Sequence, residues 1–221
     1  MKKQFLLILF IAISTISFSQ EQPSFGGKVG LISSGMRGDA VNSLKNLLDF
    51  SNGMVSTSNL TGFFAGAYVS VPVDNVISIQ PGLYYSQKGY QLKGALNLKG
   101  MDFLGANAKA ILQSQYIDIP LLLNANVGGL QIFAGPQISY LVKSELRTTA
   151  GLLGVNLLNS KLDATGQFNR WDAALTGGIG YKFSNGLNLT ASYDYGLSKV
   201  DANKNLKSYN QAVKIGLGID F

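Results

Sequence analysis

The last thirteen residues of the chain alternate strictly between two kinds of side chain. One set is mostly apolar and ends on an aromatic residue: Tyr209, Gln211, Val213, Ile215, Leu217, Ile219 and Phe221. The intervening set is small or polar: Asn210, Ala212, Lys214, Gly216, Gly218 and Asp220. Because successive side chains leave opposite faces of a β-strand, this run predicts a two-faced strand. An edge strand of a soluble sheet gives the same pattern, so the class of fold depends on whether the rest of the chain repeats it.

The alternation does recur along the chain. It predicts strands over about residues 25–33, 63–73, 76–90, 111–127, 130–146, 170–183, 187–198 and 209–221. Three short connections, at 74–75, 128–129 and 184–186, alternate with longer ones near 37–60, 93–110, 147–168 and 200–208. Outer-membrane barrels have short periplasmic turns and long extracellular loops. A soluble meander has no reason to sort its loops in this way, so the order of loop lengths favours a membrane barrel of eight strands.

The composition narrows the chemistry that the chain can perform. Cysteine and histidine are both absent, which excludes a disulfide framework, a metal site built from these residues and an imidazole base. No nucleophile elbow is present, and the glycines of 177–180 lie within a predicted strand instead of preceding a helix. We therefore expect no enzyme, no cofactor and no metal site. The lysines are spread along the chain and form no stripe with aromatic residues, so no nucleic-acid partner is expected.

The N-terminus has the features of a secretory signal peptide. Two lysines precede an apolar stretch from Phe5 to Ile13, and Ser17 and Ser19 occupy the small-residue positions of a cleavage site. We predict a signal peptide over residues 1–19 and a barrel domain over residues 20–221. A transmembrane anchor is the rival interpretation, but the apolar run is short for a helical span. The remainder has no run of eighteen apolar residues, and a closed barrel is the common way for such a chain to span a bilayer.

The polar face of the predicted strands separates a membrane barrel from a soluble one. A lipocalin-like barrel would turn the apolar face inward around a ligand, and its outer face would be rich in lysine and glutamate. Here the polar face, which includes Lys143, is mostly Gly, Ser, Asn, Thr and Gln, and only 14% of all residues are charged. Such small side chains fit the interior of an eight-stranded barrel. We predict an all-β fold, an eight-stranded antiparallel up-and-down transmembrane β-barrel, with a soluble ligand-binding barrel as the structural alternative.

Two details of the apolar face bear on this fold. Its aromatic residues gather towards the strand ends, as in the interfacial girdles of membrane barrels: Tyr140, Trp171, Tyr181, Phe183, Tyr209 and Phe221. Pro81, Pro120 and Pro136 fall inside predicted strands, where proline cannot donate to the ladder. We expect β-bulges to accommodate these three prolines.

Several charged residues fall on the predicted interior face. They are Lys28, Asp118, Asp172, Lys182, Asp194, Lys214 and Asp220. Buried charges have to be paired or hydrogen-bonded. We interpret these residues as a structural network that fills the lumen, with a proton or ion path as the sharper alternative. Because side chains normally plug an eight-stranded barrel, we expect little conductance.

The longer loops are the expected places of partner contact. Between Gly38 and Gly53, apolar residues recur at helical spacing, which fits either a short amphipathic helix or an irregular loop. The loops near 93–110 and 147–168 are also apolar. We expect the strands to extend above the membrane there, with these residues packed on one another. Exposed apolar patches often mark contact sites, so any extracellular partner is expected at these loops.

Five segments resemble a known family. "GLYYSQKG" (82–89), "YIDIPLLLNANV" (116–127), "LQIFAGPQISYLVKS" (130–144), "GGIGYKFSNGLNLTASYDYGL" (177–197) and "KIGLGIDF" (214–221) are similar to the small outer-membrane β-barrels of Bacteroidota, called PorT-like or porin-family barrels. The resemblance covers most of the mature chain. It implies an eight-stranded barrel in the outer membrane of a Gram-negative bacterium, surrounded by outer-membrane lipid and inserted by the barrel-assembly machinery. It implies no single activity.

Three classes of function follow. The first is a structural or interaction barrel that acts through its extracellular loops. The second is an accessory barrel for transport or protein secretion. The third is a lipid enzyme within the membrane, which the absence of histidine disfavours.

Overall fold

The computed structural model describes residues 22–38, 55–96, 106–152, 155–202 and 207–221. These residues form nine strands and one short 3-10 turn, η2 (Thr165–Gln167). The strands are β1 (Ser24–Arg37), β2 (Val55–Pro72), β3 (Ile77–Leu96), β4 (Ala106–Val127), β5 (Leu130–Leu152), β6 (Val155–Asp163), β7 (Trp171–Lys182), β8 (Leu187–Gly196) and β9 (Tyr209–Asp220). Within the described residues, no helix has the length and apolar character needed to cross a membrane.

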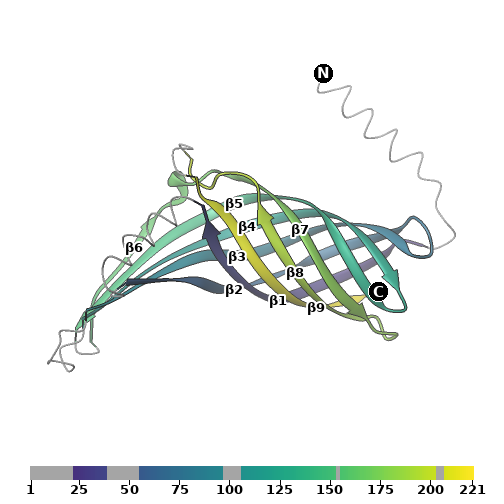
Figure 1. The fold of residues 1–221 in the computed structure, drawn as a ribbon, viewed down its shortest axis with the longest axis horizontal. Helices are drawn as coiled ribbons and strands as arrows, with labels where there is room; N and C mark the ends of the chain where they lie inside the picture. Colours follow the sequence, from purple (N-terminus) through teal and green to yellow (C-terminus); the bar gives the residue numbers. More distant parts are fainter. Residues whose placement is uncertain (1–21, 39–54, 97–105, 153–154, 203–206) are drawn as a thin grey trace, which may run out of the picture.

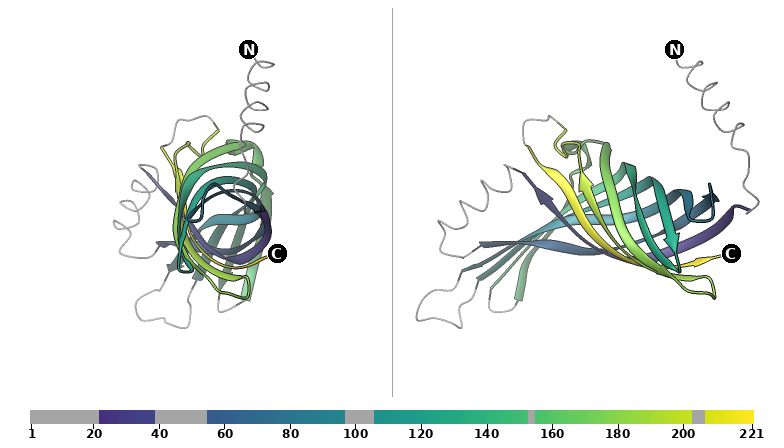
Figure 2. Two further views of the ribbon diagram at one scale, coloured as in Figure 1. Left: turned by 90° about the vertical axis from the view of Figure 1, so that its right-hand side faces the viewer. Right: turned by 45° about the vertical axis from the view of Figure 1, so that its right-hand side comes forward.

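Eight of the strands close into a barrel. The order of hydrogen-bonded neighbours is β4-β3-β2-β1-β9-β8-β7-β5, and an additional pairing of β4 with β5 completes the ring. The first and last strands meet antiparallel, with Gly26 opposite Asp220 and Arg37 opposite Tyr209. An end-on view shows the ring, and side views show its strongly tilted strands (Figures 1 and 2). The predicted fold class, including eight strands in the barrel, is confirmed.

The ninth strand, β6, lies within the segment that was predicted as a loop over 147–168. Among the described strands it pairs with β5 alone, over the C-terminal part Glu145–Leu152. Strand β7 pairs with the N-terminal part of β5, Leu130–Tyr140. Strands β2 to β5 also extend beyond the ends of β1, β7, β8 and β9. We call residues 55–59, 90–96, 106–112, 145–152 and 155–163 the protruding sheet, which leaves the barrel on one side and bends away from its axis (Figures 1 and 2). The expected extension of the strands is confirmed, while residues 39–54, which hold most of the proposed amphipathic helix, lie outside the described residues.

The three short turns lie at the end of the barrel opposite the protruding sheet. Gly128 and Gly129 form the predicted two-residue hairpin, and both have positive φ, at 60° and 88°, which favours glycine. The connection at Asp74 is longer than expected, because β2 ends at Pro72 and β3 begins at Ile77. The Asp74 carboxylate accepts hydrogen bonds from the backbone N–H groups of Val76 and Ile77, both at 2.7 Å. These bonds lower the pKa of Asp74 and fix the conformation of the turn.

The apolar face of each strand points outward. Leu31, Leu83, Ile138, Leu175 and Ile215 are more than half exposed, although none of them lies at a strand end. The interior side is polar and buried, as in β9, where buried Ala212 and Lys214 alternate with exposed Val213 and Ile215. A soluble barrel with an apolar lining does not fit this arrangement, because water would meet a continuous apolar outer surface. The structure therefore excludes the lipocalin-like alternative.

Large aromatic side chains share the interior with glycines. Phe64, Tyr68, Tyr116 and Phe133 are buried inside the barrel, which the description of a small and polar inner face missed. Glycine provides their space: a Cβ atom at Gly216 would lie 2.8 Å from Cζ of Phe64. The interior is thus densely packed because large rings occupy the space that glycines leave free.

The prolines and the bulges do not coincide, contrary to expectation. Ladder partners are missing next to Pro81, Pro120 and Pro136, but the register continues unchanged across each gap. The shifts lie between Asn59 and Phe64, between Gln115 and Tyr116 and between Ala150 and Gly151.

The shift at Gln115 corrects one interior assignment. Gln115 is opposite Lys143 and Tyr116 is opposite Leu141, so Val142 is the extra residue on β5. Val142 and Lys143 are both exposed, and Lys143 is therefore not an interior residue.

Candidate functional site

The central part of the lumen holds a buried ion cluster. Nζ of Lys88 lies 2.9 Å from Oδ1 of Asp118, whose residue is 0% exposed. Nζ of Lys214 lies 3.6 Å from the other Asp118 oxygen and 2.6 Å from Oδ2 of Asp194. Strands β3, β4, β8 and β9 supply one residue each, so the cluster joins strands from opposite parts of the sequence.

Uncharged side chains complete this cluster. Thr176 donates a hydrogen bond of 2.9 Å to Asp194. Lys214 donates to the amide oxygen of Gln137 at 3.3 Å, and the amide nitrogen of Gln137 lies 3.5 Å from Asp194. Such hydrogen bonds offset the cost of burying the charges of Asp194 and Lys214. Oδ2 of Asp118 accepts no hydrogen bond among the described residues and lies 3.6 Å from the Lys214 ammonium.

Asp172 lies apart from this cluster, near the loop end of the barrel. It accepts hydrogen bonds from the hydroxyl of Ser198 at 2.5 Å and from the amide of Asn210 at 2.7 Å. The Asn210 amide also lies 3.4 Å from the hydroxyl of Tyr116. Asp172 is therefore held by neutral donors.

The third group lies at the short-turn end. Lys182 and Asp220 form an ion pair of 2.8 Å. Asp220 also accepts a hydrogen bond from the hydroxyl of Tyr68, which in turn accepts one of 2.8 Å from the amide of Asn188. This group borders an open mouth of about 590 Å³, which Gly128, Gly129 and Phe221 help to line.

Lys28 differs from the other interior lysines. Its ammonium lies over the rings of Tyr68 and Phe133, at 5.2 and 5.7 Å from their centroids. It borders a cavity of about 40 Å³ that Phe64, Phe133 and Lys214 also line, which has room for only a few water molecules. Two aromatic faces thus stabilise this cation electrostatically.

The structure therefore places all seven predicted lumen residues inside the barrel, but in separate groups. The sequence analysis did not include Lys88 among the interior charges. The signal was available, because Lys88 lies two residues after Ser86 and therefore on the same polar strand face. With Lys88 added, the described part of the barrel interior has four cations and four carboxylates. The cations are Lys28, Lys88, Lys182 and Lys214, and the carboxylates are Asp118, Asp172, Asp194 and Asp220. Among the described residues there is no group of three or more metal-ligating side chains.

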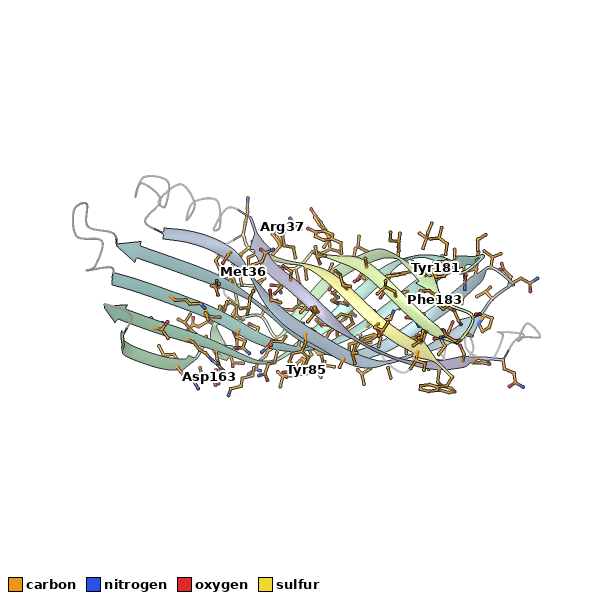
Figure 3. All side chains as sticks on the ribbon, turned by 90° about the horizontal axis from the view of Figure 1, so that it is seen from below. Met36, Arg37, Tyr85, Asp163, Tyr181 and Phe183 are labelled. Carbon is orange, nitrogen blue, oxygen red and sulfur yellow. The ribbon has the colours of Figure 1, made fainter. Side chains whose placement is uncertain are left out.

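Aromatic pairs mark both ends of the outer surface. Tyr140 and Trp171 are register partners near the loop end, and their ring centroids lie 5.0 Å apart. Tyr181 and Phe183 form a second pair near the short turns, also at 5.0 Å. Figure 3 shows Tyr181 and Phe183 towards the end of the molecule opposite Arg37 and Asp163. This arrangement matches the two interfacial girdles of a membrane barrel, with apolar residues between them.

No curated protein matches the chain at a significant level. Among solved structures, Ail, the attachment invasion locus protein of Yersinia pestis, superposes with a TM-score of 0.45 at 11% identity, over 91% of this chain and 100% of that one. OprG from Pseudomonas aeruginosa gives 0.44 at 12% identity, over 91% and 97%. Neisserial surface protein A gives 0.42 at 12% identity, over 91% and 100%.

The decisive match is to a family model. The model described as "Outer membrane protein beta-barrel domain" matches residues 18–202, which is most of the chain. It agrees with the closed ring, the apolar outer surface and the two girdles, and it places the protein in the outer membrane. The chain belongs to the outer membrane protein β-barrel domain family.

Proposed function

We propose that this protein is a non-conducting outer-membrane barrel that holds the protruding sheet outside the cell for contact with a partner. The observation that carries the proposal is the sheet itself. Strands β2 to β5 continue beyond the rim and gain β6 as a further strand, whereas β1, β7, β8 and β9 end at the rim. A barrel needed only to span the membrane does not require five strands above one side of it.

The sheet offers free strand edges. Among the described strands, β6 is the outermost and pairs with β5 alone. At the other side, residues 55–59 of β2 pair with β3 but have no ladder partner on the described part of β1, whose ladder with β2 ends at the pair Ser34 and Leu60. Exposed edges are the usual places for β-augmentation, in which a partner adds a strand to a sheet.

The lumen supports the non-conducting part of the proposal. Its charges balance, the central cluster crosses the barrel, and the cavity beside Lys28 measures only about 40 Å³. An eight-stranded barrel is just wide enough for side chains to fill it. We therefore assign the seven predicted residues, together with Lys88, a structural role, and we assign the protein no catalytic one.

We also propose a narrower family and a route to the membrane for this protein. The similar segments, among them 116–127 and 177–197, support membership of the PorT-like barrels of Bacteroidota. With this placement go a signal peptide over residues 1–19, contact with outer-membrane lipid and insertion by the barrel-assembly machinery.

Two measurements test the proposal together. In planar bilayers, the full mature protein should give no steady channel openings. In intact cells, a photo-reactive residue at Leu162 of β6, which is 60% exposed, should form a covalent adduct with a protein. The same probe at Leu175, which faces lipid in mid-strand, is the control and should yield only lipid adducts. Large steady conductance without a protein adduct at Leu162 would favour transport and contradict the proposal.

A further inference from the structure

The protruding sheet has a cationic outer face. Residues directly opposite each other in an antiparallel ladder share a face, as do residues two apart along a strand. Lys143, Glu145 and Arg147 of β5 therefore share one face. Asp163 is opposite Glu145, and Lys161 is opposite Arg147. On β4, Lys109 joins the same face because it is opposite Thr149, two residues beyond Arg147.

The bulge at Val142 makes this face continuous with the lipid-facing surface. Just above the bulge, Ser144 is buried while Lys143 is exposed, so the odd-numbered residues of β5 point outward from there. Without the extra residue, Lys143 would point into the lumen. Side-chain exposures of 48% for Lys143 and 39% for Arg147 leave both cations accessible from outside.

Arg170 extends the cationic face towards the membrane. Its guanidinium donates hydrogen bonds to the carbonyl oxygens of Leu141 and Val142, at 3.1 and 3.2 Å, directly beside the bulge. Among the residues whose side chains the structure describes, the face thus contains five cations, Lys109, Lys143, Arg147, Lys161 and Arg170, and two carboxylates, Glu145 and Asp163. These seven charges leave an excess of three positive charges.

The carboxylates of Glu145 and Asp163 already have partners within the protein. Glu145 pairs with Lys143 at 2.7 Å and with Arg147 at 3.3 Å. Asp163 accepts a hydrogen bond of 2.8 Å from the backbone N–H of Thr165. Arg147 and Lys161 stand directly opposite each other, and like charges in this position destabilise a sheet.

The height of the face relative to the membrane identifies the anion. Arg170 immediately precedes Trp171, whose ring packs on Tyr140, and this aromatic pair marks the membrane interface. Lys143 lies three residues beyond Tyr140, which is at most about 10 Å along the strand. Because barrel strands are tilted by about 35–45°, this distance corresponds to about 7–8 Å along the membrane normal. Arg170 and Lys143 therefore lie within the head-group layer, which extends about 5–8 Å beyond the hydrocarbon on each side. At the short-turn end, the described residues include only one cation, Lys182, and it is paired with Asp220 at the lumen mouth.

We propose that this face binds the phosphate groups of a phosphorylated glycolipid in the outer leaflet. Arg170 and Lys143 contact phosphate at the base of the head group, and Arg147 and Lys161 hold a second anionic group farther from the membrane. Basic clusters at a membrane surface bind anionic head groups by this combination of charge and hydrogen bonding. The inference rests on the membrane position of the barrel and not on a protein partner for the sheet.

The test measures binding of three probes to the full mature protein in detergent by native mass spectrometry. The probes are diphosphorylated lipid A, the same lipid after enzymatic dephosphorylation, and inorganic phosphate. The wild type should bind the diphosphorylated lipid, and removal of its phosphates should weaken binding at least tenfold. Lys143→Gln and Lys161→Gln should each weaken binding about fivefold, because each cation near a charged surface contributes about that factor. Lys161→Arg should retain wild-type binding.

Lys207→Gln provides a matched control, since this exposed residue lies next to β9 on a different part of the rim. It should bind the lipid as the wild type does. Equal binding by wild type, Lys143→Gln and Lys161→Gln would overturn the proposal. So would equal binding of the dephosphorylated lipid, or full competition by inorganic phosphate at millimolar concentration, which would indicate a site for free phosphate. Heat-modifiability on a gel confirms that each variant is folded before binding is measured.

Discussion

The carboxylate of Asp118 is the group whose removal should destabilise the barrel most. It is fully buried and lies within ion-pair distance of two ammonium groups, at 2.9 Å from Lys88 and 3.6 Å from Lys214. In Asp118→Ala, Lys214 keeps its 2.6 Å contact with Asp194. Lys88 loses the only ion pair that it has among the described residues, yet it stays buried. Removing one partner of a buried pair typically costs about 3–5 kcal/mol, so the free energy of unfolding should fall by about that amount.

Two further variants determine whether burial is the cause. Replacing both partners, in Lys88→Met/Asp118→Leu, removes the stranded charge and should restore most of the lost stability. Lys182→Ala breaks an ion pair of similar length, 2.8 Å, but there the lysine side chain is 35% exposed at the lumen mouth. That variant should lose about 1 kcal/mol or less.

Equilibrium unfolding by urea from lipid vesicles supplies the measurement. Trp171 is the single tryptophan of the chain and faces outward, so its emission reports the loss of the lipid environment. The reasoning is refuted if Asp118→Ala unfolds within 1 kcal/mol of the wild type. It is also refuted if the double variant is no more stable than Asp118→Ala, because the cluster would then be solvated and the lumen open to water.

Two further predictions concern other parts of the barrel. Gly216→Val should destabilise it by about 1–3 kcal/mol, because the new side chain meets Phe64 at close range; Phe64→Leu should restore part of the loss, and Ala191→Val on the lipid-facing side should have little effect. Urea unfolding checks this, and a neutral Gly216→Val would contradict the packing. At the rim, hydrogen bonds from Lys143 and Arg147 hold the pKa of Glu145 below its usual value. Their stabilising contribution is present above the unfolded-state pKa and is lost as the pH falls through the lowered value. Lys143→Gln should therefore raise the pKa of Glu145, as measured by carboxyl carbon NMR, and an unchanged value would show that the pair does not form.

The two faces of the strands were predictable because lipid and a packed lumen impose opposite requirements on neighbouring residues. Alternation such as that of Val213, Lys214 and Ile215 fixes both the strand and its orientation. The hairpin at Gly128 and Gly129 was predictable for a local reason, since only glycine readily adopts two successive positive φ angles.

Features that depend on neighbouring strands were not predictable in the same way. The bulge at Val142 depends on the register with Tyr116 and Gln115, and it reversed the expected orientation of Lys143. Strand β6 occupies a segment that was predicted as a loop, and its pairing with β5 is visible only in three dimensions. The seven lumen residues were found by strand face, but their division into groups depends on the shear of the barrel.

The central claim, that the apolar face meets lipid around a filled interior, is most directly tested by spin labels along β9. The chain contains no cysteine, so single cysteines at residues 212 to 217 can each carry one nitroxide, with Gly216 omitted because a side chain there meets Phe64. In vesicles, labels at Val213, Ile215 and Leu217 should collide frequently with dissolved oxygen, which concentrates in hydrocarbon, and labels at Ala212 and Lys214 should not. Uniform accessibility, or high oxygen collision at Ala212 and Lys214 with low values at the other three, would contradict the account.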